Sequence, residues 1–284
     1  MGREPMGDRG DATERTMVMD RDLVVVHGPD AFSFLQSLVS QDLDPVGDGD
    51  VVDSLLLTPQ GKLDVVFRLV RVGDEAWLDC DAGFGAQLAA SLNRFRIRVK
   101  AEVDDRSDGW GMVAVRDGAG GVAPTGCVTF PNGDVVGPTI ALDGIAGLDA
   151  DAYERWRIET GVPLMGVDVD EKTIPQEAFL ERSAVSFTKG CFLGQELVCR
   201  IDTRGHVNKY LRRLDITGAE RPAVGAEIRF DDRAVGVVTS VTPTDGGPIV
   251  ALGYLRREVE VPAEVTIAAA CVVAATARET SISS

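Results

Sequence analysis

The last third of the chain is a series of short β-branched runs with no helical pattern between them. These runs cover residues 210–217, 226–230, 234–241, 248–254 and 265–275. Closely spaced strands of this kind are typical of sandwiches and barrels. We therefore expect residues 206–278 to form a small antiparallel β-barrel, followed by a short tail over residues 279–284.

The first hundred residues instead alternate between strand and helix patterns. In order, the predicted elements are a strand over 23–26, a helix over 32–39, a hairpin over 50–72, a strand over 76–80, a helix over 84–95 and a strand over 97–103. Asp30 and Asp81 precede the helical stretches as N-caps, and Pro59-Gln60-Gly61 is the hairpin turn. Residues 17–105 are therefore predicted to form one α+β unit with a split βαβ order.

The middle of the chain predicts a second α+β unit, over residues 106–205. Its expected strands, separated by glycine-containing turns, are 112–115, 127–130 and 135–142. A helix then follows Asp149 as N-cap and ends at Gly161, a residue suited to a left-handed stop. Residues 1–16 have almost no apolar content, and we expect them to be disordered.

Composition limits the class of protein. The chain has 284 residues, 44% of them hydrophobic, which is enough for two or three compact units at roughly 100–200 residues each. No stretch approaches the ~18 consecutive apolar residues of a membrane span, and residues 1–16 lack the apolar centre of a secretory signal. We expect a cytoplasmic protein. The net charge of −16 repels phosphate groups, so we expect no direct nucleic-acid partner and no membrane partner.

The cysteines are scattered without a C-x-x-C pair, which indicates free thiols rather than a disulfide framework or a zinc site. They are Cys80, Cys127, Cys191, Cys199 and Cys271. The two histidines, His27 and His206, are far apart in the sequence, with one closing a strand and the other in a loop. We therefore expect neither a catalytic triad nor a metal site.

One cysteine lies in a distinctive octet, Lys189-Gly190-Cys191-Phe192-Leu193-Gly194-Gln195-Glu196. Its glycines permit backbone conformations closed to other residues and let a ligand approach the main chain. The apolar residues after it, Leu197, Val198 and Ile201, have helical spacing. Cys191 would then stand just before a helix and near a lysine, and both features favour the thiolate. We infer that Cys191 is the reactive residue.

The octet resembles the K-G-C-[FY]-x-G-Q-E motif of the folate-binding YgfZ family at all eight positions. Residues 157–163 and 174–177 resemble that family's R-x-E-x-G-x-P and I-P-Q-E segments, in the same order. The family is related to the glycine-cleavage T protein, an aminomethyltransferase, and its eukaryotic members assist iron–sulfur cluster assembly. The resemblance implies an α+β, three-lobed cloverleaf, with two α+β lobes and a C-terminal antiparallel β-barrel around a central channel.

The resemblance also implies tetrahydrofolate as the cofactor. Its pterin head has adjacent N–H donors, which one carboxylate can accept as a strong, charge-assisted pair. Glu177 falls where the family's folate-contacting glutamate lies. The remaining candidate cofactor-binding residues lie in or after the octet: Lys189, Gln195, Glu196 and Arg200.

A second feature could hold the two carboxylates of the folate tail. Four cations, Arg94, Arg96, Arg98 and Lys100, alternate with apolar residues, so a strand over 97–103 would place them on one face. That face is either simply solvated or a ligand site. Trp156 and Phe192 are open to two interpretations as well, as walls of an aromatic-ring site or as core residues.

These features together predict a tetrahydrofolate-binding accessory protein for the assembly or repair of iron–sulfur proteins. An iron–sulfur cluster needs about four ligands, usually cysteines, so this chain alone is not expected to hold one. Cys191 would instead supply one ligand to a cluster shared with a partner, or protect a thiol during transfer. The expected partners are a folate and iron–sulfur assembly or client proteins.

Two alternatives stay open. A folate-dependent one-carbon transferase would use Asp64 or Glu196 as acid or base, but we align Val65 with the aspartate of the aminomethyltransferases, one position after Asp64. One step along a strand turns a side chain to the opposite face, so Asp64 would need a bulge to take that place. The second alternative is a scaffold that binds no folate.

Overall fold

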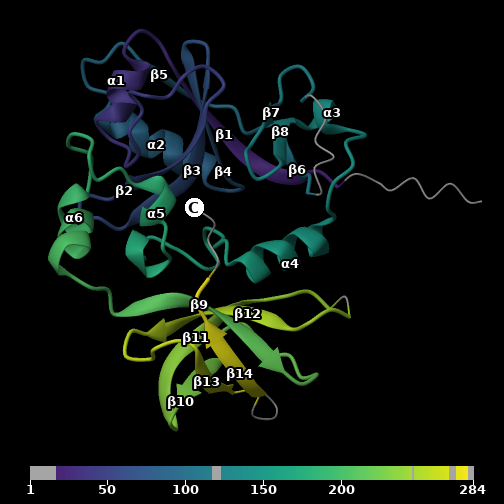
Figure 1. The fold of residues 1–284 in the computed structure, drawn as a ribbon. Helices are drawn as coiled ribbons and strands as arrows, with labels where there is room; N and C mark the ends of the chain where they lie inside the picture. The colour runs from purple at the N-terminus through teal and green to yellow at the C-terminus, as the bar shows by residue number, and fades with distance from the viewer. Residues whose placement is uncertain (1–16, 117–122, 245, 269–272, 281–284) are drawn as a thin grey trace, which may run out of the picture.

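Two sheets, one curled and one closed, organise the chain (Figure 1). The computed structural model describes residues 17–116, 123–244, 246–268 and 273–280. The predicted tail over 1–16, the last four residues of the tail predicted over 279–284, and Cys271 lie outside the described residues. The curled sheet has eight strands and the barrel has six. No helix in the described ranges is both long enough and apolar enough to cross a bilayer.

The strands of the curled sheet all come from the first half of the chain. They are β1 (Met19–His27), β2 (Val51–Leu57), β3 (Leu63–Val72), β4 (Glu75–Asp81), β5 (Glu102–Asp105), β6 (Trp110–Ala114), β7 (Val128–Thr129) and β8 (Asp134–Pro138). Their order is β2-β3-β4-β1-β6-β8-β7, with β5 paired to β1 beside this path. β1 pairs with β4 of the first predicted unit and with β6 of the second, so the two units share one sheet.

Apolar residues bury β1 on both faces. Val24 and Val26 pack with α1 (Ala31–Gln36) and α2 (Gly85–Phe95), which cover one side of the sheet. Leu23 and Val25 belong to a separate cluster with residues of β6 and β8. Because successive strand residues face opposite sides, the continuous apolar run of this strand is what covering on both faces requires.

The first turn of α2 is held by a carboxylate that is distant in sequence. Asp22 Oδ2 accepts hydrogen bonds from the amides of Gly83 and Gly85, at 2.8 and 2.7 Å. The prediction that Asp81 caps this helix was wrong, because Asp81 is the last residue of β4 and its carboxylate binds Arg21. Asp30 does stand at the start of α1, but its carboxylate accepts from the Lys100 amide.

The predicted strand over 97–103 was also wrong. The chain leaves α2 in an irregular turn, and the strand covers only β5. Arg98 has a φ of +59°, and Arg96 bends back to donate to the Ala101 carbonyl and to pair with Glu102. The four cations therefore share no strand face, and the predicted cationic stripe is absent.

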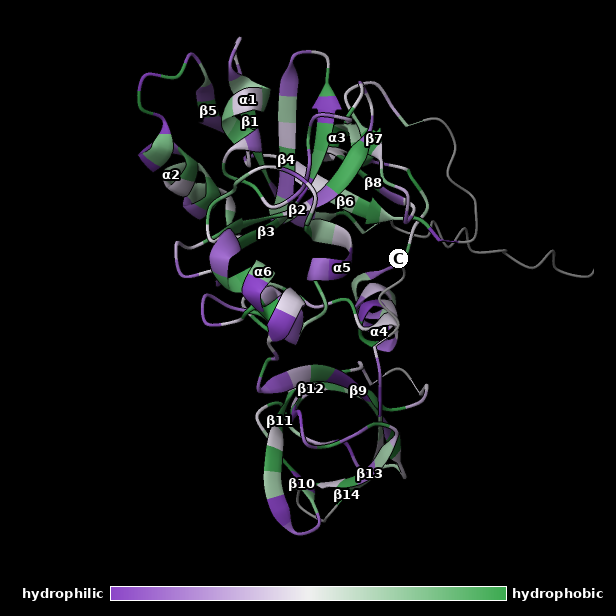
Figure 2. Ribbon diagram, turned by 60° about the vertical axis from the view of Figure 1, so that its left-hand side comes forward, coloured by the Kyte–Doolittle hydropathy of each residue, from purple (hydrophilic) through white to green (hydrophobic). Residues whose placement is uncertain are grey.

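Between the sheet and the barrel the chain forms short helices joined by loops (Figures 1 and 2). The helices of this part are α3 (Thr139–Leu142), α4 (Ala150–Thr160), the 3₁₀ turn η1 (Pro175–Glu177), α5 (Glu181–Ala184) and α6 (Gln195–Arg204). α4 begins and ends as predicted, with Asp149 accepting from the Ala152 amide and Gly161 at φ +84°. The strand predicted over 135–142 ends at Pro138, because proline has no N–H for the ladder, and α3 follows.

The C-terminal barrel closes as predicted. Its strands are β9 (Lys209–Thr217), β10 (Glu227–Phe230), β11 (Arg233–Val241), β12 (Val250–Arg256), β13 (Ala263–Ile267) and β14 (Val273–Arg278), in the order β10-β11-β12-β9-β14-β13. The run over 265–275, predicted as one strand, contains parts of two antiparallel strands. The fold class predicted from the sequence, α+β with a C-terminal antiparallel barrel, is confirmed.

Candidate functional site

A central cavity of about 260 Å³ lies where the curled sheet meets α4 and α5. Its walls combine apolar, aromatic and charged side chains, among them Val66, Phe67, Leu164, Leu180, Tyr153, Trp156, Arg21, Arg68, Asp53, Asp81 and Asp134. Ligand pockets commonly measure roughly 300–1,000 Å³, with mostly apolar walls and a few polar groups. The central cavity is therefore better suited to a compact ring system than to a long chain.

The charged side of the cavity is a buried ion-pair network. Asp79 Oδ2 accepts from Arg21 Nη2 at 2.7 Å and from Arg68 Nη2 at 2.6 Å. Arg68 also donates to Asp134, which Arg116 binds from the other side at 2.8 Å. Burial alone would raise the pKa of Asp79, but the charges of the two arginines lower it below its usual value. The carboxylate is therefore ionised, and the network fixes this wall.

The aromatic side of the cavity comes from α4. Tyr153 and Trp156 stack with ring centroids 5.7 Å apart and an interplanar angle of 30°. The guanidinium of Arg116 lies 3.8 Å from the Trp156 centroid. Nε and Nη2 of Arg116 are buried and have no hydrogen-bond partner within the described residues. Trp156, left open by the sequence, thus lies in a cavity wall beside two unsatisfied donors, whereas Phe192 is a core residue.

Lys189, the first residue of the octet, fastens the octet to the loop after α1. Its Nζ donates to the carbonyl oxygens of Gln36, Val39 and Gln41, each at 2.8 Å. Burial lowers the pKa of Lys189 to about 8, so its ammonium is protonated at neutral pH. Three acceptors match the three ammonium protons. The lysine predicted as a folate ligand is thus engaged with protein carbonyls.

Gly194 fastens the other end of the octet to the β2–β3 hairpin. It has a φ of +76°, and a Cβ there would overlap the carbonyl oxygen of Thr58. A Cβ on Gly61 in the facing turn would lie 2.8 Å from the Gly194 carbonyl oxygen. Glycine is therefore required on both sides of this contact. Gly190 has open space around it.

Cys191 lies on the exposed loop between these two attachments, before the start of α6. Gln41 connects this loop to the central cavity. Its carbonyl accepts from Lys189, and its Nε2 donates at 2.7 Å to the carbonyl of Ser183, a residue of the cavity wall. The thiol is therefore accessible, and its loop is joined to the cavity wall by one intervening residue.

The other predicted ligands occupy different places. Gln195 Oε1 accepts from the Phe192 amide, which shapes the start of α6. Glu196 and Arg200 are exposed on α6. Glu177 is buried but is not among the residues that line the central cavity. The structure thus keeps the candidates on neighbouring segments without gathering them around one cavity.

Glu177 sits in a polar environment of its own. Its Oε2 accepts from the Ile174 amide at 3.2 Å and lies 3.9 Å from Lys209 Nζ. The Lys209 ammonium in turn lies over the ring of Tyr254. Burial raises the pKa of the Glu177 carboxyl, although Lys209 opposes this shift. A buried carboxylate with one amide and one distant cation is incompletely satisfied by the protein.

The R-x-E-x-G-x-P segment joins the lobes to the barrel. Arg157 is 2% exposed and donates to Asp168 Oδ2 at 2.7 Å, to Ser240 Oγ at 3.1 Å and to Glu154. Ser240 lies on β11, and it donates to the other oxygen of Asp168. Arg157 therefore has a structural role in fixing α4 against the barrel.

Asp64 is at a β-bulge. Leu56 pairs with Val65 and Leu57 with Leu63, which leaves Asp64 as the extra residue of β3. Its Oδ1 accepts from Gln87 Nε2 on α2 at 2.8 Å, and it does not line the central cavity. The bulge that a transferase would need is present, but the carboxylate faces α2.

Sequence reasoning missed the ion-pair network of the cavity wall. Arg68 and Asp79 stand alone within apolar runs of predicted strands, which is the signal that could have found them. A charged residue in such a run is rarely buried unless paired. Within the described residues, no group of three histidine, cysteine, aspartate or glutamate side chains is arranged to hold a metal ion.

No family model matches the chain. It is 25% identical to "tRNA-modifying protein YgfZ" of Cronobacter sakazakii over 84% of this chain and 83% of that protein. It is 28% identical to "Iron-sulfur cluster assembly factor IBA57 homolog, mitochondrial" of Mycosarcoma maydis, over 72% of this chain and 58% of that protein.

The fold is similar to that of the glycine cleavage system aminomethyltransferase T from Bartonella henselae. The TM-score is 0.74, with 19% sequence identity, over 92% of this chain and 83% of that structure. Sequence similarity to YgfZ and IBA57 proteins therefore coincides with an aminomethyltransferase fold. The chain is thus similar in sequence to YgfZ and IBA57 proteins and has the fold of an aminomethyltransferase.

Proposed function

We propose that this protein is a cytoplasmic, tetrahydrofolate-binding accessory factor for the assembly or repair of iron–sulfur proteins. The observation that carries the proposal is the pairing of the central cavity with an exposed thiol on a fastened loop. The relatives support it, since one is named an iron–sulfur cluster assembly factor and the matching fold belongs to an aminomethyltransferase.

The residues of the central cavity fit the head and linker of a reduced folate. The stacked Tyr153 and Trp156 line the cavity and offer aromatic contacts for a planar ring. Asp53 in the cavity wall forms no ion pair within the described ranges and can accept from the pterin N–H groups. Glu177 would need to turn toward the pterin to accept them, and its incomplete satisfaction favours such a change.

Cys191 is proposed to contact the iron–sulfur protein partner rather than the folate. An exposed thiol can become a thiolate ligand to iron, and the remaining ligands of a cluster would come from the partner that carries it. Lys189 and Gly194 position the loop without contacting the substrate cluster. The bound folate is proposed to stabilise this part of the molecule rather than to be consumed.

Calorimetric titration with tetrahydrofolate tests the cavity. We expect saturable binding to the wild type and at least about tenfold weaker binding to Trp156→Ala, because a stacked ring and its buried area are lost. Phe95→Ala, on the exposed side of α2, is the matched control and should bind like the wild type. Wild-type protein without saturable binding would support the scaffold alternative.

Complementation tests the thiol. In a strain that lacks the gene, Cys191→Ala should fail to restore iron–sulfur enzyme activity under oxidative stress, whereas Cys199→Ala, in partly buried surroundings on α6, should restore it. Full restoration by Cys191→Ala would overturn the proposed role of the thiol while leaving the folate proposal intact.

The aminomethyltransferase fold also supports one-carbon transfer as a second candidate. Turnover of methylene- or methyl-tetrahydrofolate that is lost in Asp64→Asn would establish it. The position of Asp64, bonded to Gln87 away from the cavity, favours the accessory role. A relative carries the name tRNA-modifying protein, but a net charge of −16 disfavours direct contact with RNA, and we propose no RNA-binding surface here.

A further inference from the structure

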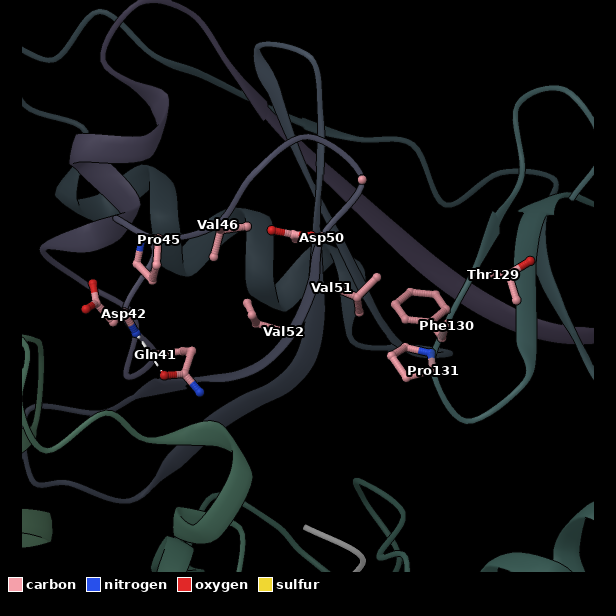
Figure 3. A pocket seen from close by; sticks show the side chains of 11 residues that line it. Gln41, Asp42, Pro45, Val46, Asp50, Val51, Val52, Thr129, Phe130 and Pro131 are labelled. Atoms are coloured by element: carbon pink, nitrogen blue, oxygen red, sulfur yellow. Dashed lines mark hydrogen bonds between the residues drawn. The ribbon is translucent and has the colours of Figure 1, made fainter. Parts of the chain in front are cut away.

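A groove of about 810 Å³ lies where the two edges of the curled sheet approach each other (Figure 3). We call it the β2–β7 groove. Residues of the loop before β2 and of β2 itself line one side, and the end of β7 with the turn after it lines the other. The lining residues are Gln41, Asp42, Pro45, Val46, Gly49, Asp50, Val51, Val52, Thr129, Phe130 and Pro131. In Figure 3, Val51 points toward Phe130 and Pro131 across the groove.

The β2 side of the groove is an unpaired strand edge. Within the described residues, β2 pairs only with β3. The Asp50 carbonyl accepts from the amide of Arg71 on β3. Along an antiparallel strand, successive residues direct their N–H and C=O groups alternately toward one neighbour and toward the opposite side. Val51 and Asp53 therefore direct their N–H and C=O groups away from β3. Leu55 is the next residue in this alternation and confirms the direction. Its N–H donates to Ser40 Oγ and its carbonyl accepts from the Ser40 amide, both on the side away from β3.

The floor of the groove is apolar. Val46 and Val52 pack on the core beneath α1 and α2. Val51 packs with Phe130 on the opposite core of the sheet. A strand laid along the β2 edge would thus find apolar contacts for its alternate side chains, which is how an added strand gains specificity.

The rim of the groove is acidic. Asp42 and Asp50 line it, and no lysine or arginine does. Asp44 and Asp48 are exposed on the same loop, between them. None of these four carboxylates forms a salt bridge within the part of the chain that the structure describes, although Asp42 and Asp44 interact at longer range with the Lys189 ammonium. Hydrogen bonds from Gln36 and the Asp44 amide lower the pKa of Asp42.

We propose that the β2–β7 groove binds an extended, basic segment of a partner protein by β-strand addition to β2. The free amide and carbonyl groups of Val51 and Asp53 supply the backbone pairing. The carboxylates on the rim select lysine or arginine over acidic side chains. This proposal does not rest on folate binding, although Asp53 also lines the central cavity and the carbonyl of Gln41 in the groove accepts from Lys189 of the cysteine loop.

The charge of the groove distinguishes this partner from others. Anionic phosphate groups of nucleic acids and of lipid headgroups would be repelled by the same rim. A second copy of this chain is disfavoured by its net charge of −16. A basic extended segment is the one class that matches the open backbone, the apolar floor and the acidic rim together.

Fluorescence anisotropy with a labelled hexapeptide that alternates lysine and valine tests the proposal. We expect saturable binding to the full chain, weakened at least about tenfold in the Asp42→Asn/Asp50→Asn double variant. Asparagine retains the acceptor oxygens that bind Gln36 and Gly47, so the fold should persist. Asp231→Asn, an exposed change on the distant barrel, should bind like the wild type.

The backbone component needs a separate probe. The same hexapeptide with every internal backbone nitrogen methylated has no N–H to donate from either edge and should bind at least about tenfold more weakly. Val51→Pro removes one outward N–H from β2 and should weaken the unmodified peptide. Three outcomes would each overturn the proposal: equal binding of the methylated peptide, equal binding of a glutamate–valine hexapeptide, or no saturable binding of the lysine–valine peptide to the wild type. These outcomes can be measured on the wild-type protein even if Val51→Pro fails to fold.

Discussion

Replacing Gly194 by alanine should destabilise the protein through one backbone contact. The residue has a φ of +76°, and an L-residue in this region costs roughly 1–2 kcal/mol. The new Cβ would also overlap the Thr58 carbonyl oxygen and lie 3.0 Å from Leu57 Cβ, both on the hairpin rather than on flexible chain ends. Overpacking of this kind costs roughly 1–3 kcal/mol.

One effect acts in the other direction. Alanine lowers the conformational entropy of the unfolded chain relative to glycine, which stabilises the native state by about 0.4–1 kcal/mol. The net loss in the free energy of unfolding is therefore about 1–5 kcal/mol, or a fall in Tm of roughly 2–20 °C at about 2–4 °C per kcal/mol for a chain of this size class. Urea unfolding followed by circular dichroism, and thermal scans of the same samples, measure it.

The octet supplies its own control. Gly190 has no atom within 4 Å of the position that a Cβ would take, so Gly190→Ala should change the free energy of unfolding by less than about 0.5 kcal/mol. Comparable losses in the two variants would refute the reasoning. So would a fully stable Gly194→Ala protein, because the hairpin would then have moved without cost.

Three further predictions use the same unfolding assay. Arg157→Met should cost about 3–5 kcal/mol because it leaves Asp168 buried without its cation, whereas Arg229→Met, which removes an exposed pair, should cost less than about 1 kcal/mol; similar losses would contradict this. Lys189→Met should cost about 1–3 kcal/mol by orphaning three carbonyls, and the exposed Lys172→Met should be nearly neutral. Burial raises the pKa of Glu177, so the native state holds that proton more tightly than the unfolded state, and stability falls as pH rises from the unfolded value of about 4.3 through the folded one. Glu177→Gln should therefore raise the free energy of unfolding at pH 7.5 but not at pH 4; a loss at pH 7.5 would show that the carboxylate stabilises the fold.

Local sequence signals predicted the elements whose causes are local. The helix from Asp149 to Gly161 carried a cap at each end, and the last third had closely spaced β-branched runs with no helical pattern between them, which indicated a barrel. Errors arose where a distant residue decides the structure. Asp22 rather than Asp81 binds the first amides of α2, and this pairing spans more than sixty residues.

The candidate site was predictable only in part for the same reason. The octet identified Cys191, and the structure exposes it. The sequence did not reveal that Lys189 binds three carbonyls of another loop, because those acceptors are main-chain atoms with no residue signature. The sharing of one sheet by two predicted units also depended on β1 pairing on both sides, which periodicity along a single strand cannot show.

The two attachments of the cysteine loop determine how far its sulfur can travel. With Lys189 pinned on one side and Gly194 seated against Gly61 on the other, only four residues span the anchors. A loop this short cannot carry its sulfur over a long distance, as the flexible prosthetic groups that move between distant active centres do. Any exchange at Cys191 must therefore be completed by a partner that comes to rest against it, so the shape of that partner, rather than motion of this protein, would set which iron centres it can serve.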